Sequence, residues 1–445
     1  MSGSGSYIKE VKNTFWIILF RIIRLGLSFF ISILTTRYLG PERYGITYYA
    51  VSLAGFFVPV ALLGLNDTLI RELSESPDRE GEILGTSLIM SSVSSVLSSA
   101  VMVFLAFLLN RNDSVTVWFC GLYSLSLLFQ NYELLTCWFQ RRFQSKYPSA
   151  AVVLAFVVSS AYRVYLLVTQ KEILWFAMTT VIDYAIMSLI LFICYRMLDG
   201  PKLSFSVQTG KELLDRSKYY ILTSIIVASF STVDKIMLKA IVGEIENGLY
   251  SAAYNLAGST SFLYSALIES QRPTIVGIAN ADKEAFESRV KSLFSMMFWV
   301  SVIQNIGFTV FGKLIVKILL GEEYMKAVPV FRVLTWFTTF SYIGAARNVW
   351  ILATDNHRHL WRINLIGATC GLIMNYLLIR NFGMIGAAVT AILTQFITNY
   401  LTGFVFKDVR PVNELLLQAL DPRNILNYLK EAMAEFRGRK QTDNT

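Results

Sequence analysis

Apolar runs long enough to cross a membrane recur along almost the whole sequence, and they limit what the chain can fold into. Each run is about 20 residues long, which is the length an α-helix needs to span the hydrocarbon core of a bilayer. Only 16% of the residues are charged, against about 25% in an average soluble domain, and the mean hydropathy is +0.50. So little charge cannot cover a water-exposed surface. The sequence therefore predicts an all-α integral membrane protein.

Twelve runs of this kind give the predicted spans. They are Thr14–Thr36, Ile46–Leu65, Ile83–Leu109, Val115–Trp138, Ser149–Val168, Ile173–Tyr195, Tyr219–Leu238, Gly248–Ile268, Ser292–Leu320, Val328–Ala353, Leu360–Ile379 and Met384–Phe406. The first run is longer than the apolar region of a cleavable signal peptide, and no small-residue cleavage site follows it. It is therefore predicted to be the first transmembrane helix.

Positive charge is distributed unequally between the two sets of connections. The tail and the connections on the side of the N-terminus hold 25 Lys and Arg residues, and the opposite connections hold 7. Cytoplasmic segments of membrane proteins carry such an excess, so both termini are expected in the cytoplasm and the protein in the cell inner membrane. This asymmetry accounts for the net charge of +9, and the short loops leave no domain for nucleic-acid binding.

The sequence contains an internal repeat. A shift of 203 residues aligns one set of small and apolar residues with another: Gly40, Gly45, Ala50, Leu53, Ala54 and Gly55 with Gly243, Gly248, Ala253, Leu256, Ala257 and Gly258. A second match, at a shift of 211 residues, relates the fifth span to the eleventh. We expect the shared glycines at tight turns and close helix contacts.

The repeat predicts twelve transmembrane helices in two pseudo-equivalent six-helix bundles around a central cavity. The expected parts are a cytoplasmic lead 1–13, an N-terminal bundle 14–196, a cytoplasmic linker 197–218, a C-terminal bundle 219–406 and an amphipathic cytoplasmic tail 407–445. In transporters with parallel repeats the substrate path lies between the halves, which rock against each other. Duplication of this kind favours transport over catalysis.

Three segments resemble a known family. They are RYLGPERYGITYYAVSLAG after the first span, TVDKIMLKAIVGEIENGLYSAAYNLAG around the seventh, and NYLLIRNFGMIGAAVTAILTQ at the eleventh and twelfth. These segments resemble the polysaccharide transporter, or Wzx-type flippase, family of the multidrug/oligosaccharidyl-lipid/polysaccharide exporter superfamily. The resemblance covers about the first 400 residues.

This resemblance implies a transport function. The expected substrate is undecaprenyl-pyrophosphate-linked oligosaccharide, a unit of O-antigen (lipopolysaccharide), capsule or exopolysaccharide, moved from the inner to the outer leaflet by alternating access. Membrane lipids are expected partners, and a polysaccharide polymerase and a chain-length protein are candidate partners. No nucleic-acid partner is expected.

Cationic side chains inside the predicted spans are the first candidates for function, because each costs about 2.5 to 3.5 kcal/mol to insert into a bilayer. They are Arg21, Arg24, Arg163, Lys235, Lys239, Arg332 and Arg347. Guanidinium forks and ammonium groups bind phosphate and carboxylate oxygens. We expect these residues to line a cationic cavity that holds a pyrophosphate or an acidic sugar. The alternative for each is a side chain that reaches the nearby interface.

Other charged residues suggest coupling and gating. Asp183 and Asp234 lie inside spans, where a carboxylate either exchanges H⁺ or Na⁺ or forms a salt bridge with an arginine. Asp67, Glu269 and Arg272 stand at the cytoplasmic ends of the second and eighth spans and are candidates for an inner gate. Polar residues at a helix end need no such role, so this alternative stays open.

Other chemistry has little support in the sequence. The four cysteines show no metal-ligand spacing, and no nucleotide-binding, zinc-protease or serine-hydrolase motif occurs. We therefore expect no enzyme activity, cofactor or metal. Two alternative functions stay open. An ion-coupled multidrug antiporter of the same superfamily would favour acidic residues in its cavity, and a membrane polysaccharide polymerase would need a larger extramembrane loop.

Overall fold

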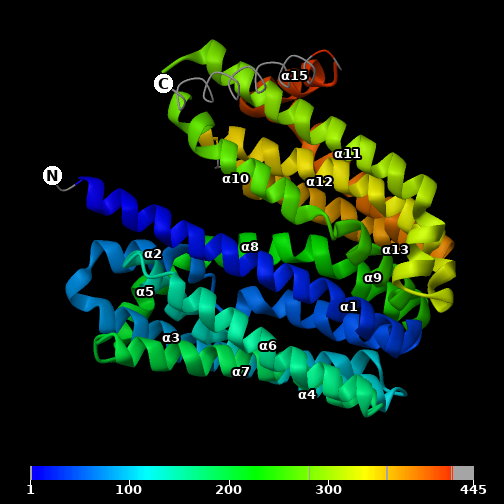
Figure 1. Ribbon diagram of the computed structural model, residues 1–445, viewed down its shortest axis with the longest axis horizontal. Coiled ribbons are helices and arrows are strands. Elements are labelled where there is room, and N and C mark those ends of the chain that lie inside the picture. The colour runs from blue at the N-terminus through cyan, green and yellow to red at the C-terminus, as the bar shows by residue number, and fades with distance from the viewer. Residues whose placement is uncertain (1–2, 280, 357–358, 422, 424–445) are drawn as a thin grey trace, which may run out of the picture. The chain divides into compact units, whose positions relative to one another are not determined.

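The computed structural model describes residues 3–279, 281–356, 359–421 and 423, with their side chains except those of residues 3–25 and 67. All regular structure in these residues is helical. The chain packs into two compact units, Met1–Gly248 and Leu249–Thr445. Each unit is a bundle of helices (Figure 1).

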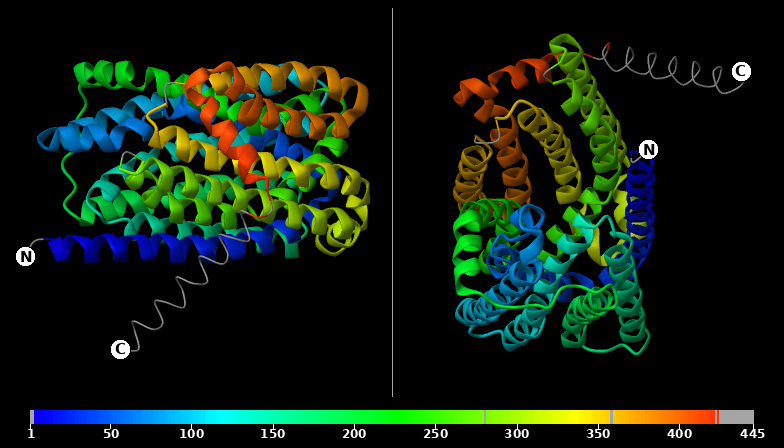
Figure 2. Two further views of the ribbon diagram at one scale, coloured as in Figure 1. Left: turned by 90° about the horizontal axis from the view of Figure 1, so that it is seen from above. Right: turned by 90° about the vertical axis from the view of Figure 1, so that its left-hand side faces the viewer.

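The first unit is built from eight α-helices and the start of a ninth, within the described residues. They are α1 (Gly3–Ala61), α2 (Asn66–Glu75), α3 (Glu80–Leu109), α4 (Ser114–Gln130), α5 (Leu135–Arg141), α6 (Lys146–Val168), α7 (Ile173–Met197), α8 (Val207–Ile241) and the beginning of α9 (Glu244–Gly258). In this unit α7 packs between α4 and α6, and α1 packs against α3, α6 and α8 (Figures 1 and 2).

The second unit contains the rest of α9 and the helices that follow it. They are α10 (Ser261–Ile278), α11 (Lys283–Leu319), α12 (Val328–Ala353), α13 (Leu360–Phe396), α14 (Thr402–Val405) and α15 (Arg410–Ala419). A π-helical segment, Ile397–Leu401, joins α13 to α14. Helix α12 packs against α10, α11 and α13, and an apolar core around Tyr342 and Phe294 lies among them.

Two glycines reverse or bend the chain inside helices α1 and α13. Gly40 has φ of 66° and Gly383 has φ of 54°, and L side chains rarely adopt this left-handed region. Each of these helices therefore contains two of the predicted spans. Counted in this way, each of the twelve predicted spans overlaps one or more helical segments.

The structure differs from the expected spans at three places. The fourth span is divided into α4 and α5 by a 3₁₀ turn, Asn131–Leu134, and the eighth into α9 and α10 after Gly258. Helix α8 begins at Val207, within the stretch expected as a linker, because Ser206 caps it by accepting a hydrogen bond from the Thr209 amide. Helix α8 packs on α1, α2 and α3, so it lies in the first unit. The assignment of six helices to each repeat stays a prediction.

The glycines of the repeat make a reciprocal close contact. A Cβ atom added to Gly45 would lie 1.9 Å from the carbonyl oxygen of Glu244, and one added to Gly248 would lie 1.8 Å from that of Pro41. Glu244 is the residue that the repeat aligns with Pro41, so the two glycines are equivalent in space as well as in sequence. The predicted role of shared glycines in close helix contacts is confirmed at these two positions.

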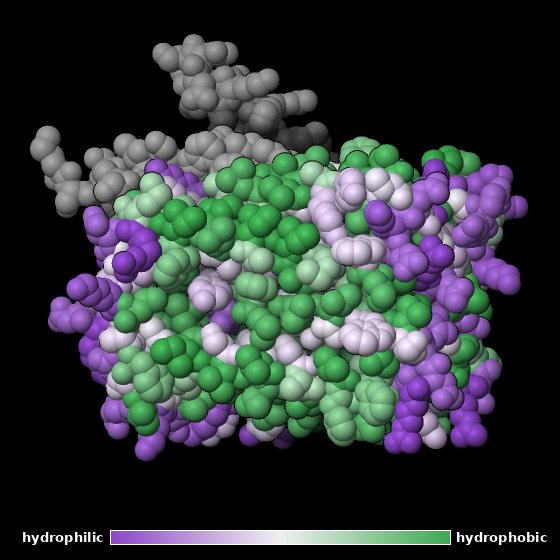
Figure 3. Space-filling view, turned by 90° about the horizontal axis from the view of Figure 1, so that it is seen from below, coloured by the Kyte–Doolittle hydropathy of each residue, from purple (hydrophilic) through white to green (hydrophobic). Residues whose placement is uncertain are grey.

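The surface is that of a membrane protein. In the described residues, seven helical stretches are long and apolar enough to cross a membrane by length and composition, and two of them, Gly26–Ala61 and Leu360–Val405, contain the bends at Gly40 and Gly383. Figure 3 shows a broad apolar band on one face, with hydrophilic residues at its two ends. Large apolar side chains such as Leu97, Phe104 and Trp118 are exposed, as helices facing lipid require.

The chain after the last span folds back onto the second unit. Helix α15 is amphipathic, and it packs its buried face, which includes Val412 and Leu416, against α11 and α14 (Figure 2). Residues 424–445 of the predicted amphipathic tail 407–445 lie outside the described residues.

Candidate functional site

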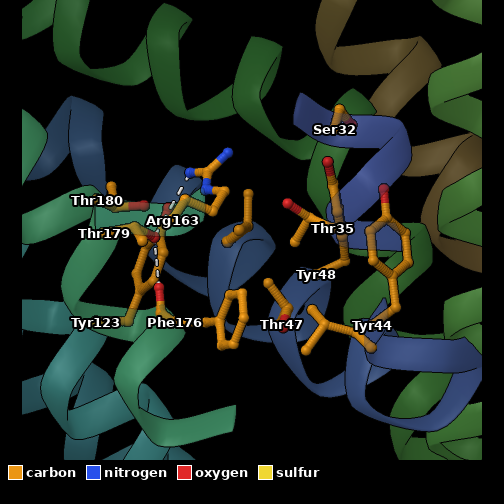
Figure 4. A pocket seen from close by; sticks show the side chains of 12 residues that line it. Ser32, Thr35, Tyr44, Thr47, Tyr48, Tyr123, Arg163, Phe176, Thr179 and Thr180 are labelled. Carbon is orange, nitrogen blue, oxygen red and sulfur yellow. Dashed lines mark hydrogen bonds between the residues drawn. The ribbon is translucent and has the colours of Figure 1, made fainter. Parts of the chain in front are cut away.

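The first unit contains a polar pocket of about 210 Å³ inside its helical bundle. Its wall is formed by the two arms of α1, before and after Gly40, and by α4, α6 and α7 (Figure 4). The lining residues are Ser32, Thr35, Leu39, Tyr44, Thr47, Tyr48, Val51, Tyr123, Arg163, Phe176, Thr179 and Thr180.

Helical spacing explains why α1 contributes so much of the wall. Thr35 and Leu39 are four residues apart before the bend, and Tyr44 and Tyr48 are four apart after it. Residues with this spacing share one face of a helix. Because the chain bends at Gly40, the two faces line the same pocket.

Arg163 on α6 is the one charged side chain among the lining residues (Figure 4). Its Nη2 donates a long hydrogen bond, 3.5 Å, to the hydroxyl of Thr179 on α7. None of the ion pairs in the described part of the chain involves Arg163. A guanidinium carries five N–H donors, so most of its bonding capacity is available to a bound molecule.

Asp183, also on α7, lies close to this pocket. Its carboxylate accepts a hydrogen bond of 3.2 Å from the Ser159 hydroxyl, and its charge acts on Arg163 and Tyr123. Arg163 and Asp183, two residues singled out by the sequence, are therefore brought near each other by α6 and α7. Whether Asp183 couples transport to an ion stays a prediction.

Lys235 and Asp234 are neighbours on α8 and are both buried. The Lys235 ammonium lies 3.4 Å from the Asp234 carboxylate and donates a hydrogen bond of 2.7 Å to the Ser231 carbonyl. The sequence leaves open a salt bridge between Asp234 and an arginine as the alternative to ion coupling; in the structure the cation beside Asp234 is the adjacent Lys235.

Lys239, one turn further along α8, is buried among acceptors. It contacts the Asn110 side-chain oxygen and lies 3.3 Å from Asp113 and 3.1 Å from Glu244. Its ammonium also lies 5.2 Å from the ring centre of Tyr49. Burial raises the pKa of Asp113, but hydrogen bonds from Thr116 and the charge of Lys239 outweigh it and hold the pKa below its usual value. Lys239 therefore ties α8 to the link between α3 and α4.

A second pocket, of about 630 Å³, lies beside this ion pair. It is lined by residues of two links and by helical residues of α1, α4, α7 and α9: Glu42, Arg43, Ile46, Asn112, Asp113, Val115, Glu172, Ile173, Leu174 and Glu244. Its wall is acidic, in contrast to the wall around Arg163. Among the residues that the structure describes, no three His, Cys, Asp or Glu side chains are grouped in a way that could hold a metal ion.

Arg347 lies in the second unit and is 1% exposed. Its Nη1 donates a hydrogen bond of 2.8 Å to the Thr398 carbonyl in the π-helical segment. Its Nε and Nη2 are buried and have no hydrogen-bond partner among the described residues. These two donors form one edge of the guanidinium, the edge that binds carboxylates and phosphates bidentately.

The remaining predicted residues of the second unit lie at exposed positions. Arg332 is exposed on α12 and its side chain crosses Gly312 of α11. Glu269 and Arg272 form an exposed salt bridge of 3.0 Å on α10. Their role as an inner gate stays a prediction.

Three predicted residues have side chains outside the description. Arg21 and Arg24 belong to the first arm of α1, and Asp67 belongs to α2. The proposed meeting of all seven cationic residues around one cavity therefore stays a prediction.

The sequence did not single out the threonines of the Arg163 pocket. Thr35, Thr47 and Thr179 lie in apolar spans, where isolated Thr and Ser are common and satisfy themselves within the helix. A signal was present in the spacing of Tyr44, Thr47, Tyr48 and Val51 along one face. This face becomes a site only when α6 and α7 bring Arg163 and Thr179 to it.

Comparison with known proteins identifies the family of this chain. A model of the polysaccharide biosynthesis protein family matches residues 11–279, which is more than half of the chain. The chain belongs to this family. The resemblance found in the sequence is thereby confirmed.

Two curated relatives have names that fit this family. The capsular polysaccharide biosynthesis protein CapF of Staphylococcus aureus is 22% identical over 37% of this chain and 42% of its own length. The probable low-salt glycan biosynthesis flippase Agl15 of Haloferax volcanii is 23% identical over 45% of this chain and 44% of its own length. The chain thus spans under half the length of these relatives.

Solved structures share the fold over nearly the whole chain. The lipid II flippase MurJ, in an inward closed conformation, matches with a TM-score of 0.73 at 13% identity and covers 93% of this chain and 92% of its own. An inward-facing multidrug resistance transporter of the MATE family matches with a TM-score of 0.69 at 14% identity, over 88% and 95%. These solved structures have twelve transmembrane helices in two bundles, so the predicted fold class of an all-α integral membrane protein is confirmed.

Proposed function

We propose that this protein is a flippase for lipid-linked oligosaccharide. Its cargo would be an undecaprenyl-pyrophosphate-linked repeat unit of O-antigen, capsule or exopolysaccharide, moved from the inner to the outer leaflet of the cytoplasmic membrane by alternating access. The family match and the transporter fold support the general class. Both termini would lie in the cytoplasm, as the distribution of 25 and 7 basic residues predicts.

The observation that carries this proposal is the chemistry of the Arg163 pocket. Eight of its twelve lining residues carry hydroxyl groups, and its one charged side chain is a guanidinium. Sugars present many hydroxyl groups and, in lipid-linked form, a phosphate, so such a wall complements a glycan better than an apolar cation. A pocket of about 210 Å³ lies below the roughly 300 Å³ minimum typical of ligand sites, so it would hold only part of this cargo.

The second candidate is an ion-coupled multidrug antiporter. The acidic pocket lined by Glu42, Asp113, Glu172 and Glu244 favours it, because antiporters of cationic drugs need negative charge. However, Asp113 and Glu244 already pair with Lys239, which reduces the net charge available to a drug.

A gene deletion in the source organism would separate these candidates. The flippase proposal expects surface polysaccharide to disappear and its lipid-linked precursor to accumulate in the inner leaflet, with no change in drug susceptibility. The wild-type gene should restore the polymer. The Arg163→Ala variant should not restore it while it reaches the membrane at the wild-type level, and Arg71→Ala, at an exposed site on α2, should restore it.

Other outcomes would contradict the proposal. Increased drug sensitivity with normal surface polysaccharide would support the antiporter. Surface polymer of altered chain length, with normal translocation of single units, would instead support a polymerase.

A further inference from the structure

Three threonines of the Arg163 pocket can offer a bound molecule only hydrogen-bond acceptors. The Thr35 hydroxyl donates to the Ile31 carbonyl at 2.7 Å, and the Thr47 hydroxyl donates to the Arg43 carbonyl at 2.9 Å. The Thr179 hydroxyl donates to the carbonyl of Phe176. A hydroxyl has one proton, so each of these oxygens can serve a bound molecule only as an acceptor. The molecule must therefore bring donors of its own.

Arg163, by contrast, supplies hydrogen-bond donors and a positive charge. Figure 4 shows its guanidinium on one side of the pocket, with Thr35 and Tyr48 on the other side. It has only the long contact to Thr179 and no ion pair with a described residue. A planar guanidinium binds the two oxygens of a carboxylate, or two phosphate oxygens, through parallel hydrogen bonds.

The charge around the pocket limits how much negative charge it can hold. Arg163 is the one charged lining residue, and Asp183 lies close enough for its charge to act on it. A pyrophosphate would bring at least two negative charges and, near neutral pH, few protons to donate to Thr35, Thr47 and Thr179. A molecule with one acidic group and several hydroxyl groups satisfies both sides of the wall.

The aromatic lining agrees with a sugar ring. Tyr48, Tyr123 and Phe176 contribute apolar ring surface, and the Tyr44 and Tyr48 rings lie 4.5 Å apart. Tyrosine combines such a surface with a polar hydroxyl, which suits a pyranose with apolar C–H groups and polar hydroxyl groups. The volume of about 210 Å³ restricts the pocket to a small part of a lipid-linked oligosaccharide.

We infer that this pocket binds one carboxylated sugar residue, such as a hexuronic acid, of the transported oligosaccharide. The carboxylate lies against Arg163, and the ring hydroxyl groups donate to Thr35, Thr47 and Thr179. The inference rests on the proposed flippase function and specifies which part of the cargo this site takes.

Binding of small probes to the purified full-length protein in lipid nanodiscs tests this assignment. The probes are glucuronate, glucose and inorganic pyrophosphate, and binding is measured by calorimetry and by the shift in unfolding temperature. Glucuronate should bind at millimolar concentration and more tightly than glucose. Arg163→Gln should weaken glucuronate binding roughly ten-fold or more, with glucose binding nearly unchanged.

Two further variants separate the roles in the pocket. Arg163→Lys keeps the charge but loses the planar fork, so glucuronate binding should be intermediate. Thr47→Val replaces the hydroxyl acceptor with a methyl group of nearly equal size, so both glucuronate and glucose should bind more weakly. Arg71→Gln, on an exposed helix outside the pocket, should bind every probe like the wild type. Size-exclusion profiles and circular dichroism verify that each variant is folded.

Two results would overturn this assignment. Glucuronate binding that is unchanged in Arg163→Gln, or equal to glucose binding in the wild type, excludes a carboxylate on Arg163. Pyrophosphate binding that depends on Arg163 and exceeds glucuronate binding makes the pocket a phosphate site instead.

Transport in reconstituted liposomes distinguishes this failure from failure of the proposed function. Translocation of lipid-linked oligosaccharide without Arg163-dependent glucuronate binding keeps the flippase and removes the acidic-sugar site. Absence of translocation for both neutral and acidic cargo, in protein that is folded, removes the proposed function itself.

Discussion

The contact between Gly45 and Gly248 gives the sharpest prediction about the fold. A Cβ atom at Gly45 would lie 1.9 Å from the Glu244 carbonyl oxygen, and real Cβ atoms essentially never come nearer than 3.0 Å. The two backbones must therefore separate by about 1.1 Å to admit a methyl group. Because both sides of the contact are backbone, no flexible side chain can make room.

Gly45→Ala should therefore destabilise the protein by about 3 kcal/mol, the upper end for overpacking in a well-packed core. For a unit of this size, about 1 kcal/mol corresponds to roughly 2–4 °C, so unfolding is expected about 6–12 °C below the wild type. Thermal unfolding in detergent, followed by intrinsic fluorescence, measures the shift. Gly248→Ala should have a similar effect, because it meets the Pro41 carbonyl at 1.8 Å.

Two control variants provide stability changes with which that of Gly45→Ala can be compared. Gly121→Ala lies inside α4 with no atom within 4 Å of the new methyl group, so it should leave stability unchanged or raise it by about 0.5–1 kcal/mol. Gly55→Ala meets the Thr232 side chain at 3.2 Å, which can move, so its effect should be smaller than that of Gly45→Ala.

The double variant tests the reciprocity of the contact. Gly45→Ala and Gly248→Ala push the same pair of backbones apart, so together they should cost less than the sum of the single changes. Full additivity, or unfolding of Gly45→Ala within a degree or two of Gly121→Ala, would refute the contact and the spatial equivalence of these glycines.

Three further predictions concern Asp113, Arg347 and Gly383. Asp113→Asn should lower the unfolding temperature at pH 7. The pKa of Asp113 is depressed in the folded protein, so the charged carboxylate stabilises the fold above its usual pKa of 3.8. This stabilisation is lost as the pH falls through the lower pKa of the folded state. The difference in unfolding temperature between the wild type and Asp113→Asn should therefore close on acidification. Arg347→Met should keep or raise stability, because a buried, incompletely bonded charge is replaced by a similar apolar volume, while Arg347→Ala should lose about 2–5 kcal/mol by leaving a cavity. Gly383→Ala should cost about 1–3 kcal/mol, because it forces an L side chain into a backbone conformation, φ 54° and ψ −135°, that essentially only glycine adopts.

Each of these three predictions has an outcome that would contradict it. A stability gap between the wild type and Asp113→Asn that persists well below pH 3.8 would show that the carboxylate is not held by Lys239. Arg347→Met that unfolds as early as Arg347→Ala would show that the guanidinium is stabilised by groups beyond Thr398. Wild-type stability of Gly383→Ala would contradict the bend in α13.

Much of the fold could be predicted from the sequence, because membrane insertion leaves few alternatives. Apolar runs of about 20 residues require helices, since every backbone group inside lipid must be satisfied within its own segment. The repeat at 203 residues indicated that Gly45 and Gly248 occupy equivalent places, and the contact at Pro41 and Glu244 bears this out. The ends of helices were less predictable: α8 begins at Val207 because Ser206 caps it and Thr209 contacts Arg79 of a distant segment.

The candidate site was only partly accessible from the sequence. Arg163 could be singled out because a charge in an apolar span needs a reason. The surrounding threonines could not, since Thr35 and Thr179 are far apart in the sequence and each is satisfied within its own helix.

The sequence by itself determined the class of the molecule, its helical spans and the residues whose charge is costly in lipid, because composition and spacing act locally. Only the tertiary structure decided what each charge meets. Lys239 is bound by Asp113, which is 126 positions away, whereas Arg163 opens into a pocket. Both are cations in apolar helices, and their difference arises from the neighbours that packing brings to them, which no local pattern encodes.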